Sequence, residues 1–426
     1  MHIFKPKYKK SNFVSPCKFL KHNINKIQNI KMKTNRIIII FIFSVFFCSA
    51  KAQQLGDNAQ ISLLTCGAGN ELYSIFGHCA IRVCDEENNL DVVFNYGTFD
   101  FSTENFYLKF SRGTLMYMLS ACNFDDFLES YKRENRSVYE QKLNISSSEK
   151  QKLFDLLIEN YKPQNRNYRY DFFKDNCATR IRDILQKTLG EKLDFSNQNT
   201  QGNHTFRQLI YPYLEKMQWS KLGIDILLGI PTDAKATNAD YMFLPDELMK
   251  NVDTAKIDGQ NLGTKPEIIY MQRDVEVSVP LSPNMVFSIF MFITVLLSCF
   301  EFYRLKQNKK FNIKIFDRLF FVIMALLSLV ILFLWFFSLH YPVRPNLNIL
   351  WLNPLYFYVC IKLSKTNIYV LLACIACNLA VLCLQYFLPQ HFNTAFFAII
   401  IAATIRLAML VAVKLHLRRD KKTNYL

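Results

Sequence analysis

Five apolar segments in the last third of the chain constrain its fold more than any other feature. Four of them approach the roughly 20 residues that a helix needs to cross a bilayer. The third is shorter and contains Asn348, Asn353 and Pro354. The segments are 284–302, 319–339, 347–363, 368–388 and 394–415. We therefore expect residues 284–426 to form an all-α transmembrane bundle.

The distribution of positive charge gives this bundle a topology. Lys and Arg residues are concentrated between the first two apolar segments and again in the tail after residue 415. Positive residues mark cytoplasmic loops, and the tail reaches the cytoplasm only if residues 347–363 also cross the membrane. We therefore predict five spans in a bacterial inner membrane, with residues 53–283 on its outer, periplasmic side.

A shorter apolar stretch near the N-terminus resembles a secretory signal. Residues 37–47 follow Lys33 and Arg36, and a small-x-small pattern ends at Ala52. These are the parts of a signal peptide, so we assign 1–52 to a basic extension and signal peptide cleaved after Ala52. A retained anchor would give the same topology, and a start at Met32 would remove most of the basic extension.

The charge balance argues against a nucleic-acid partner. The whole chain carries a net charge of +16, but 1–36 contributes +10 and 284–426 contributes +12, which leaves −6 for the part between them. A nucleic-acid-binding domain would carry its basic excess on the folded soluble part. The positive charge here surrounds apolar segments and reflects membrane topology.

Residues 53–275 have the patterns of an exported α+β domain. Alternating apolar residues predict strands near 61–64, 77–84, 91–96 and 115–119, with the middle two forming a hairpin. The sum is a small antiparallel sheet with packed helices, followed by a linker at 276–283.

Three helices are expected to pack against this sheet. A short one is predicted at 71–76. Ser146 and Glu149 have the spacing of a capping box that opens a second helix. A third is predicted to run from Ala178, with Gly190 ending it.

Cys177 is the strongest candidate for a reactive residue. Asp175 and Asn176 are typical N-cap residues, so Cys177 is predicted to lie in the first turn of a helix. The backbone N–H groups and the positive dipole end there favour a thiolate, and they can also stabilise an oxyanion. An inert buried thiol or a disulfide is the structural alternative, because the exported part holds five cysteines.

A reactive thiolate needs a base, and the exported part offers two histidines. His78 begins a strand directly after Gly77, where its side chain can reach a neighbouring helix terminus, whereas His204 lies in a polar loop. We therefore expect a Cys177–His78 dyad. Cys and His spacings typical of a metal site are not found outside the membrane segments, so neither a metal nor a diffusible cofactor is expected.

Three residues of the membrane part are candidates for substrate binding. Arg406 lies near the middle of the last span, where it either extends toward the cytoplasmic side or holds an anionic head group. Arg344 and Trp351 belong to a polar, Pro-broken stretch at 341–354. That stretch either lines a cavity or forms an ordinary interfacial belt.

Three motifs of the exported part together resemble Lnb-type lipoprotein N-acyltransferases. They are Gly77-His78-x-Ala-Ile-Arg, Phe94-Asn-Tyr-Gly-x-Phe-Asp-Phe101 and Tyr170-Asp-Phe-Phe-x-Asp-Asn-Cys-Ala-Thr-Arg180. A histidine on a strand, followed much later by an Asn-Cys pair at a helix start, is also similar to circularly permuted papain-like folds of the NlpC type. The resemblance implies a papain-like fold for the exported domain.

The resemblance also implies roles for single residues. Cys177 would be the nucleophile and His78 its general base. The group that orients the imidazole would come from the paired strand, which offers Asp91 or Asn95. Asn176, next to the nucleophile, is expected to contact substrate.

The function implied is acyl transfer between membrane partners. An acyl chain would move from a membrane glycerolipid ester, through a Cys177 thioester, to the N-terminal amine of a bacterial lipoprotein. Two alternatives stay open: an NlpC-type cell-wall peptidase or amidase with the same dyad, and a non-catalytic membrane receptor or assembly factor. The sequence does not indicate an oligomeric state.

Overall fold

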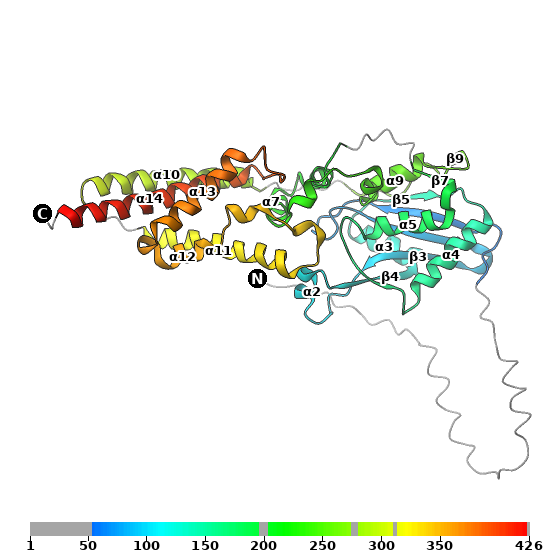
Figure 1. Cartoon of the computed structure of the whole chain (residues 1–426). Coiled ribbons are helices and arrows are strands. Elements are labelled where there is room, and N and C mark those ends of the chain that lie inside the picture. The colour runs from blue at the N-terminus through cyan, green and yellow to red at the C-terminus, as the bar shows by residue number, and fades with distance from the viewer. Residues whose placement is uncertain (1–52, 196–202, 274–279, 310–312, 424–426) are drawn as a thin grey trace, which may run out of the picture. The chain divides into compact units, whose positions relative to one another are not determined.

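A computed structural model describes residues 53–195, 203–273, 280–309 and 313–423, the side chains of 418–423 excepted. The predicted signal peptide and its cleavage site lie outside these residues. From Gln54 onward the described chain forms one compact unit, in which an α+β part is followed by a bundle of helices (Figure 1).

Seven antiparallel strands form the main sheet, in the order β10-β5-β1-β2-β3-β4-β6. Their bounds are β1 Gln60–Cys66, β2 His78–Asp85, β3 Leu90–Thr98, β4 Met116–Asn123, β5 Val138–Lys142, β6 Asn167–Arg169 and β10 Glu267–Tyr270. The four predicted strands are present, and β2 and β3 form the predicted hairpin. A second sheet consists of β7 Leu193–Asp194, β8 Lys256–Ile257 and β9 Gln260–Asn261. The predicted α+β class is confirmed.

Helices cover both faces of the main sheet because its strands alternate apolar residues inward and outward. Ile61, Leu63 and Ile81 point into a core shared with α4, α5 and α9, whereas Leu64, Ala80 and Val93 pack against α3. The helices of this part are α2 Phe106–Arg112, α3 Phe124–Arg133, α4 Ser147–Tyr161, α5 Cys177–Leu189, α6 Phe206–Ile210, α7 Gln218–Leu227, α8 Asn238–Tyr241 and α9 Pro245–Thr254.

Helices α4 and α5 begin at the capping residues that the sequence predicts. The helix predicted at 71–76 is absent. Helix α4 begins with a complete capping box between Ser146 and Glu149. The helix expected at 71–76 is wrong, because these residues form successive turns closed by hydrogen bonds to Ser74 O from the N–H groups of Gly69 and Gly77. The backbone groups of this segment are thus used in turns and in a contact with Gly69, and not in the i to i−4 hydrogen bonds of an α-helix.

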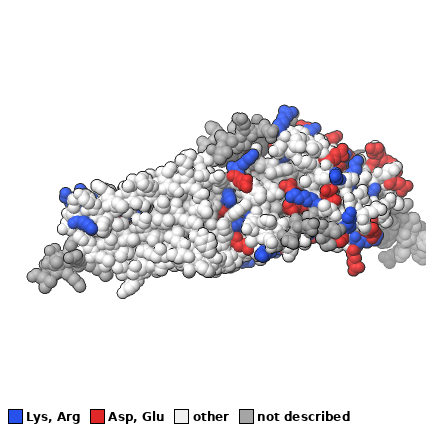
Figure 2. All heavy atoms as spheres, turned by 90° about the horizontal axis from the view of Figure 1, so that it is seen from above, with Lys and Arg blue, Asp and Glu red and all other residues white. Residues whose placement is uncertain are grey.

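The C-terminal part is helical, as predicted. Its helices are α10 Pro283–Lys306, α11 Lys314–Phe337, α12 Leu355–Lys362, α13 Ile368–Leu384 and α14 Ala395–Thr423. Among the described residues, three helices (α10, α11 and α14) are long and apolar enough to cross a membrane. Figure 2 shows the matching surface, a broad region with very few charged side chains. Helix α12 spans only about 12 Å at 1.5 Å per residue, so five crossings stay a prediction.

Arg406 lies fully buried in this bundle with protein carboxylates as its partners. Its guanidinium forms two hydrogen bonds to Asp317, at 2.7 and 2.9 Å, and one to Glu301 at 2.8 Å. A fourth joins Nη1 to the hydroxyl of Ser298 at 2.9 Å. The cluster connects α10, α11 and α14, so Arg406 stabilises the bundle and its charge is already balanced without a lipid head group.

The Pro-broken stretch at 341–354 binds α7 of the exported part. The side-chain amides of Asn346 and Asn348 donate to backbone oxygens of Ile226 and Asp225, at 2.8 and 2.9 Å. Trp351 is buried and donates to Asn348 at 2.9 Å, whereas Arg344 is exposed. These contacts make the stretch a structural connection between the exported part and the bundle.

We expect Arg406→Leu to lower the free energy of unfolding by about 3–5 kcal/mol, because it leaves two buried carboxylates without their cation. Denaturant unfolding of the full chain in detergent micelles measures this change. Arg344→Leu removes an exposed guanidinium and is the matched control, with little expected effect. Equal stability of the two variants would contradict the assigned role of Arg406.

Candidate active site

The start of α5 is fixed by the side chain of Asn176. Its Oδ1 accepts the N–H groups of Ala178 and Thr179, each at 2.9 Å. Its Nδ2 donates to the carbonyl oxygens of Phe172 and Phe243, each at 2.8 Å. Asn176 is buried with both ends of its amide engaged by the protein. It therefore positions the helix start and has no polar atom turned toward a substrate.

Cys177 is the first residue of α5, and its sulfur is surrounded by donors. A Cβ built on Gly97 would lie 3.7 Å from Cβ of Cys177 and 3.8 Å from Cε1 of His78, so the two side chains are close neighbours. Burial by itself raises the pKa of this thiol, but the charge of His78 and hydrogen bonding by His78 and by the backbone N–H groups of Cys79 and Ala178 outweigh it and lower the pKa below the usual value. The environment therefore favours a thiolate.

His78 lies between Cys177 and Asn95. Its Nε2 is 2.5 Å from Oδ1 of Asn95. A carboxamide oxygen only accepts, so Nε2 carries the proton of this bond, and Nδ1 is the ring nitrogen that remains available to Cys177. Burial by itself lowers the pKa of His78, but the Cys177 charge and the hydrogen bonds to Cys177 and Asn95 raise it. Both pKa directions favour a thiolate–imidazolium pair.

The structure distinguishes between the two candidates for the orienting group. Asn95 contacts His78, whereas Asp91 forms a two-pronged ion pair with Arg82, with both distances at 2.7 Å. Arg82 also pairs with Glu140 at 3.1 Å. The Asp91 carboxylate is thus engaged across the hairpin, and Asn95 is the residue that holds the imidazole.

The cysteines near this site are free thiols, and the nearest ones differ from Cys177 in their acidity. Cys66, Cys79, Cys84, Cys122 and Cys177 form no disulfide. Burial raises the pKa of Cys66 to about 12, the opposite direction to Cys177. The thiolate is therefore favoured by the helix start and by His78, and not by burial.

A β-bulge brings the third strand close to the sulfur. The register of β3 and β4 shifts between Asn95 and Thr98, and Gly97 within it has φ +91°. A Cβ at Gly97 would lie 3.7 Å from Cβ of Cys177 and 3.8 Å from Cε1 of His78. The missing side chain and the left-handed backbone let β3 approach both groups.

Tyr168 is a residue of this site that the sequence analysis missed. A Cβ built on Gly97 would lie 3.9 Å from the Tyr168 hydroxyl. This buried oxygen has no hydrogen-bond partner among the described residues. The guanidinium of Arg180 lies 3.6 Å above its ring and pairs with Asp175. Burial raises the pKa of Tyr168, so the hydroxyl keeps its proton. No local motif marks Tyr168, because its neighbours come from β3 and α5.

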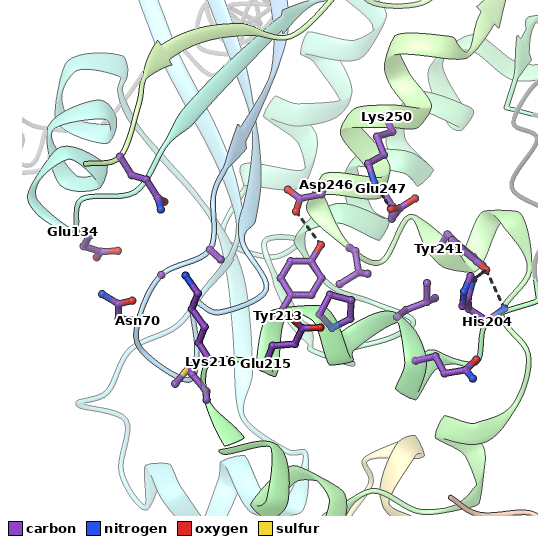
Figure 3. Close-up of a pocket in the computed structure, with 18 of the residues that line it drawn as sticks. Asn70, Glu134, His204, Tyr213, Glu215, Lys216, Tyr241, Asp246, Glu247 and Lys250 are labelled. Carbon is purple, nitrogen blue, oxygen red and sulfur yellow. Dashed lines mark hydrogen bonds and ion pairs between the residues drawn. The ribbon is translucent and has the colours of Figure 1, made fainter. Parts of the chain in front are cut away.

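A large polar pocket of about 1080 Å³ is a separate feature of the exported part (Figure 3). Its lining includes His204, whose Nδ1 is 3.0 Å from the hydroxyl of Tyr241, and Asp246, which accepts from Tyr213 at 2.9 Å. Cys177 and His78 are not among its lining residues. The second histidine of the sequence analysis therefore belongs to this pocket and not to the dyad.

The remaining candidates are not brought to the dyad by any contact described above. Arg406 binds Asp317 and Glu301, Trp351 binds Asn348, and Arg344 is exposed. Within 53–195, 203–273, 280–309 and 313–423, no group of three or more His, Cys, Asp or Glu side chains is placed to hold a metal ion.

Comparison with known families gives two matches along the chain. The model described as the Lnb N-terminal periplasmic domain matches residues 46–211, and the one described as the Lnb transmembrane domain matches 274–418. No curated protein and no solved structure matches, so the papain-like arrangement stays a prediction. The first match includes Cys177, His78, Asn95 and Tyr168.

A free cysteine thiol has a pKa of about 8.5. We expect Cys177 to react with iodoacetamide at lower pH than such a thiol does. His78→Ala removes the charge that lowers the Cys177 pKa, so its alkylation profile should move to higher pH. Mass spectrometry of the Cys177 peptide against pH measures both profiles. The peptide of Cys122, whose pKa is raised by burial, is the internal control. Identical profiles for Cys177 in the two proteins would contradict the thiolate–imidazolium pair.

Proposed function

Because this chain belongs to the Lnb family and is a membrane protein with a periplasmic part, we propose that it is a thiol acyltransferase. It would move an acyl chain from a membrane glycerolipid to the N-terminal amine of a bacterial lipoprotein. The observation that carries this proposal is the Cys177 thiol at the start of α5, with a lowered pKa, beside a histidine that Asn95 holds.

The first step would transfer the acyl group to the enzyme. The Cys177 thiolate attacks the ester carbonyl carbon of the glycerolipid and forms a carbon–sulfur bond. The carbon–oxygen bond of the ester then breaks. The departing glycerolipid oxygen takes the proton from Nδ1 of the His78 imidazolium, which leaves a thioester and a neutral histidine.

The negative charge that develops on the carbonyl oxygen needs donors in this step. The backbone N–H of Cys79 is among the groups that lower the pKa of Cys177, and the Tyr168 hydroxyl is a nearby donor without a hydrogen-bond partner among the described residues. We assign these two groups to the oxyanion. Tyr168 suits this role because a hydroxyl with no ground-state partner stabilises only the charged transition state.

The second step would transfer the acyl group to the lipoprotein. An N-terminal α-amine has a pKa of about 7.7–8.0, so an appreciable fraction is uncharged at neutral pH, unlike a lysine. The amine nitrogen attacks the thioester carbon, neutral His78 takes the proton at Nδ1, and the carbon–sulfur bond breaks. The products are an amide and the thiolate–imidazolium pair, so the chain's own residues carry every proton.

The cell-wall peptidase would use the same dyad, and the membrane helices distinguish the two functions. A peptidoglycan fragment offers no lipid chain for a bundle to bind, whereas a glycerolipid ester lies at the membrane surface. Purified protein supplied with phospholipid vesicles and a synthetic diacylated lipopeptide, or with muropeptides, tests the two directly.

With phospholipid and diacylated lipopeptide, we expect an added N-terminal amide on the lipopeptide, detected by mass spectrometry. Cys177→Ala should abolish it because no thioester can form. His78→Ala should lower it by about 10²–10⁴-fold through loss of acid–base transfer. Asp91→Asn, in the same strand as Asn95 but paired with Arg82, is the control. Cleavage of muropeptides with no change in the lipopeptide would remove the acyltransferase proposal.

Tyr168→Phe is expected to lower kcat by about 10²-fold with little change in KM, as for other oxyanion donors. The hydroxyl has no hydrogen-bond partner in the part of the chain that the structure describes, so its loss should not affect folding or the alkylation of Cys177. Steady-state assays with varied lipopeptide separate kcat from KM. Wild-type kcat in this variant would exclude Tyr168 from the oxyanion site.

A further inference from the structure

Helix α2 and its flanks expose several large apolar side chains. Tyr107 is 79% exposed, Leu108 is 51% exposed and Phe110 is 49% exposed. Phe101, just before the helix, and Met116, just after it, are also at least half exposed. Contiguous apolar surface of this kind marks a contact with a protein or with a membrane. We call these five side chains the α2 face.

The α2 face adjoins the end of a membrane helix. The backbone N–H of Leu339 donates to Arg112 O at 2.9 Å, and Nε2 of His340 is 2.7 Å from Phe110 O. Both contacting residues directly follow α11, and Figure 1 shows α2 beside this end of the helix. Helix α10 follows the periplasmic part and leads inward, so α11 returns and ends at the outer surface of the membrane.

A continuous series of aromatic rings leads from the α2 face to the active site. Phe106 lies between Phe110 and Phe99, with ring centroids 6.3 and 5.9 Å away. Phe99 contacts Tyr117 at 5.2 Å, and Tyr117 stacks on Tyr170 at 4.4 Å.

The last ring of the series lies next to the buried cluster that holds the nucleophile. Tyr170 packs against this cluster, which contains Cys177 and Tyr117. Aromatic packing therefore extends from the α2 face to the cluster around the sulfur, and no charged side chain takes part in the series of ring contacts.

We propose that the α2 face lies in the outer-leaflet boundary between head groups and acyl chains, and that the aromatic series guides a lipid acyl chain to Cys177. Aromatic and aliphatic side chains on a short helix beside a span are suited to this boundary. Lys109 and Arg112 in the last turn of α2 suit the phosphates above it. The choice of a lipid as occupant rests on continuity with α11, and its use as acyl donor rests on the proposed function.

Photo-crosslinking tests the membrane contact without any need for activity. In a Cys177→Ala background reconstituted in phospholipid vesicles, p-benzoylphenylalanine in place of Tyr107 should crosslink to phospholipid. The same amino acid in place of Ile158, an exposed residue of α4, is the matched control and should not. Crosslinks from position 107 to a second copy of the chain, or lipid crosslinks no stronger than the control, would overturn the proposal.

An activity test addresses the guidance of the acyl chain. The double variant Tyr107→Ser and Leu108→Ser should lower acyl transfer from vesicle phospholipid by about tenfold. Alkylation of Cys177 and turnover of water-soluble p-nitrophenyl butyrate should be unchanged, and Ile158→Ser should leave all three rates unchanged. Unchanged transfer from vesicles, or an equal loss with the soluble ester, would overturn the guidance role. If position 107 crosslinks to lipid but the wild-type protein shows no acyl transfer, the proposed function is rejected and the membrane contact stands.

Discussion

The interactions of the Cys177 sulfur with His78 and with the start of α5 are the ones on which this account depends. They reverse the effect of burial, which raises the pKa of neighbouring Cys66 to about 12. Three parts of the fold must meet to make them. Asn176 fixes the first turn of α5, Asn95 holds the imidazole, and Gly97 lets β3 approach closely. A reactive sulfur thus depends on local capping and on strand pairing together.

Two kinds of polar contact hold the membrane part together and join it to the exported part. Arg406 and its carboxylates tie three helices together inside the bundle. At the outer end, Asn346 and Asn348 bind the backbone of α7, and the residues after α11 bind α2. These polar contacts attach the exported part to the bundle, so the apolar α2 face is held at the membrane boundary. A lipid ester could then reach the sulfur without crossing water.

Local sequence patterns led to the prediction of the Cys177–His78 dyad. The residues around the dyad and the partners of Arg406 depend on long-range contacts, which the sequence does not show. The capping residues before Cys177 and the alternation after His78 are short-range signals, so both residues were identified from the sequence. Asp91 and Asn95 lie in the same strand an even number of residues apart, so the sequence does not tell which of them contacts His78. The structure shows Asp91 paired with Arg82 across the hairpin and Asn95 in contact with His78. Tyr168 and the partners of Arg406 come from distant segments, so no local pattern reveals them. The turns at 71–76 depend on hydrogen bonds to Ser74 that composition does not encode.

The central claim is that Cys177 carries the acyl group, and trapping that intermediate tests it most directly. The full chain is incubated with phospholipid vesicles and no lipopeptide, and the Cys177 peptide is then analysed by mass spectrometry. The account predicts one acyl chain on this peptide, removed by neutral hydroxylamine as expected of a thioester and absent in Cys177→Ala. Phospholipid turnover by the wild type while the Cys177 peptide stays unmodified, or an equal acyl adduct in Cys177→Ala, would contradict it.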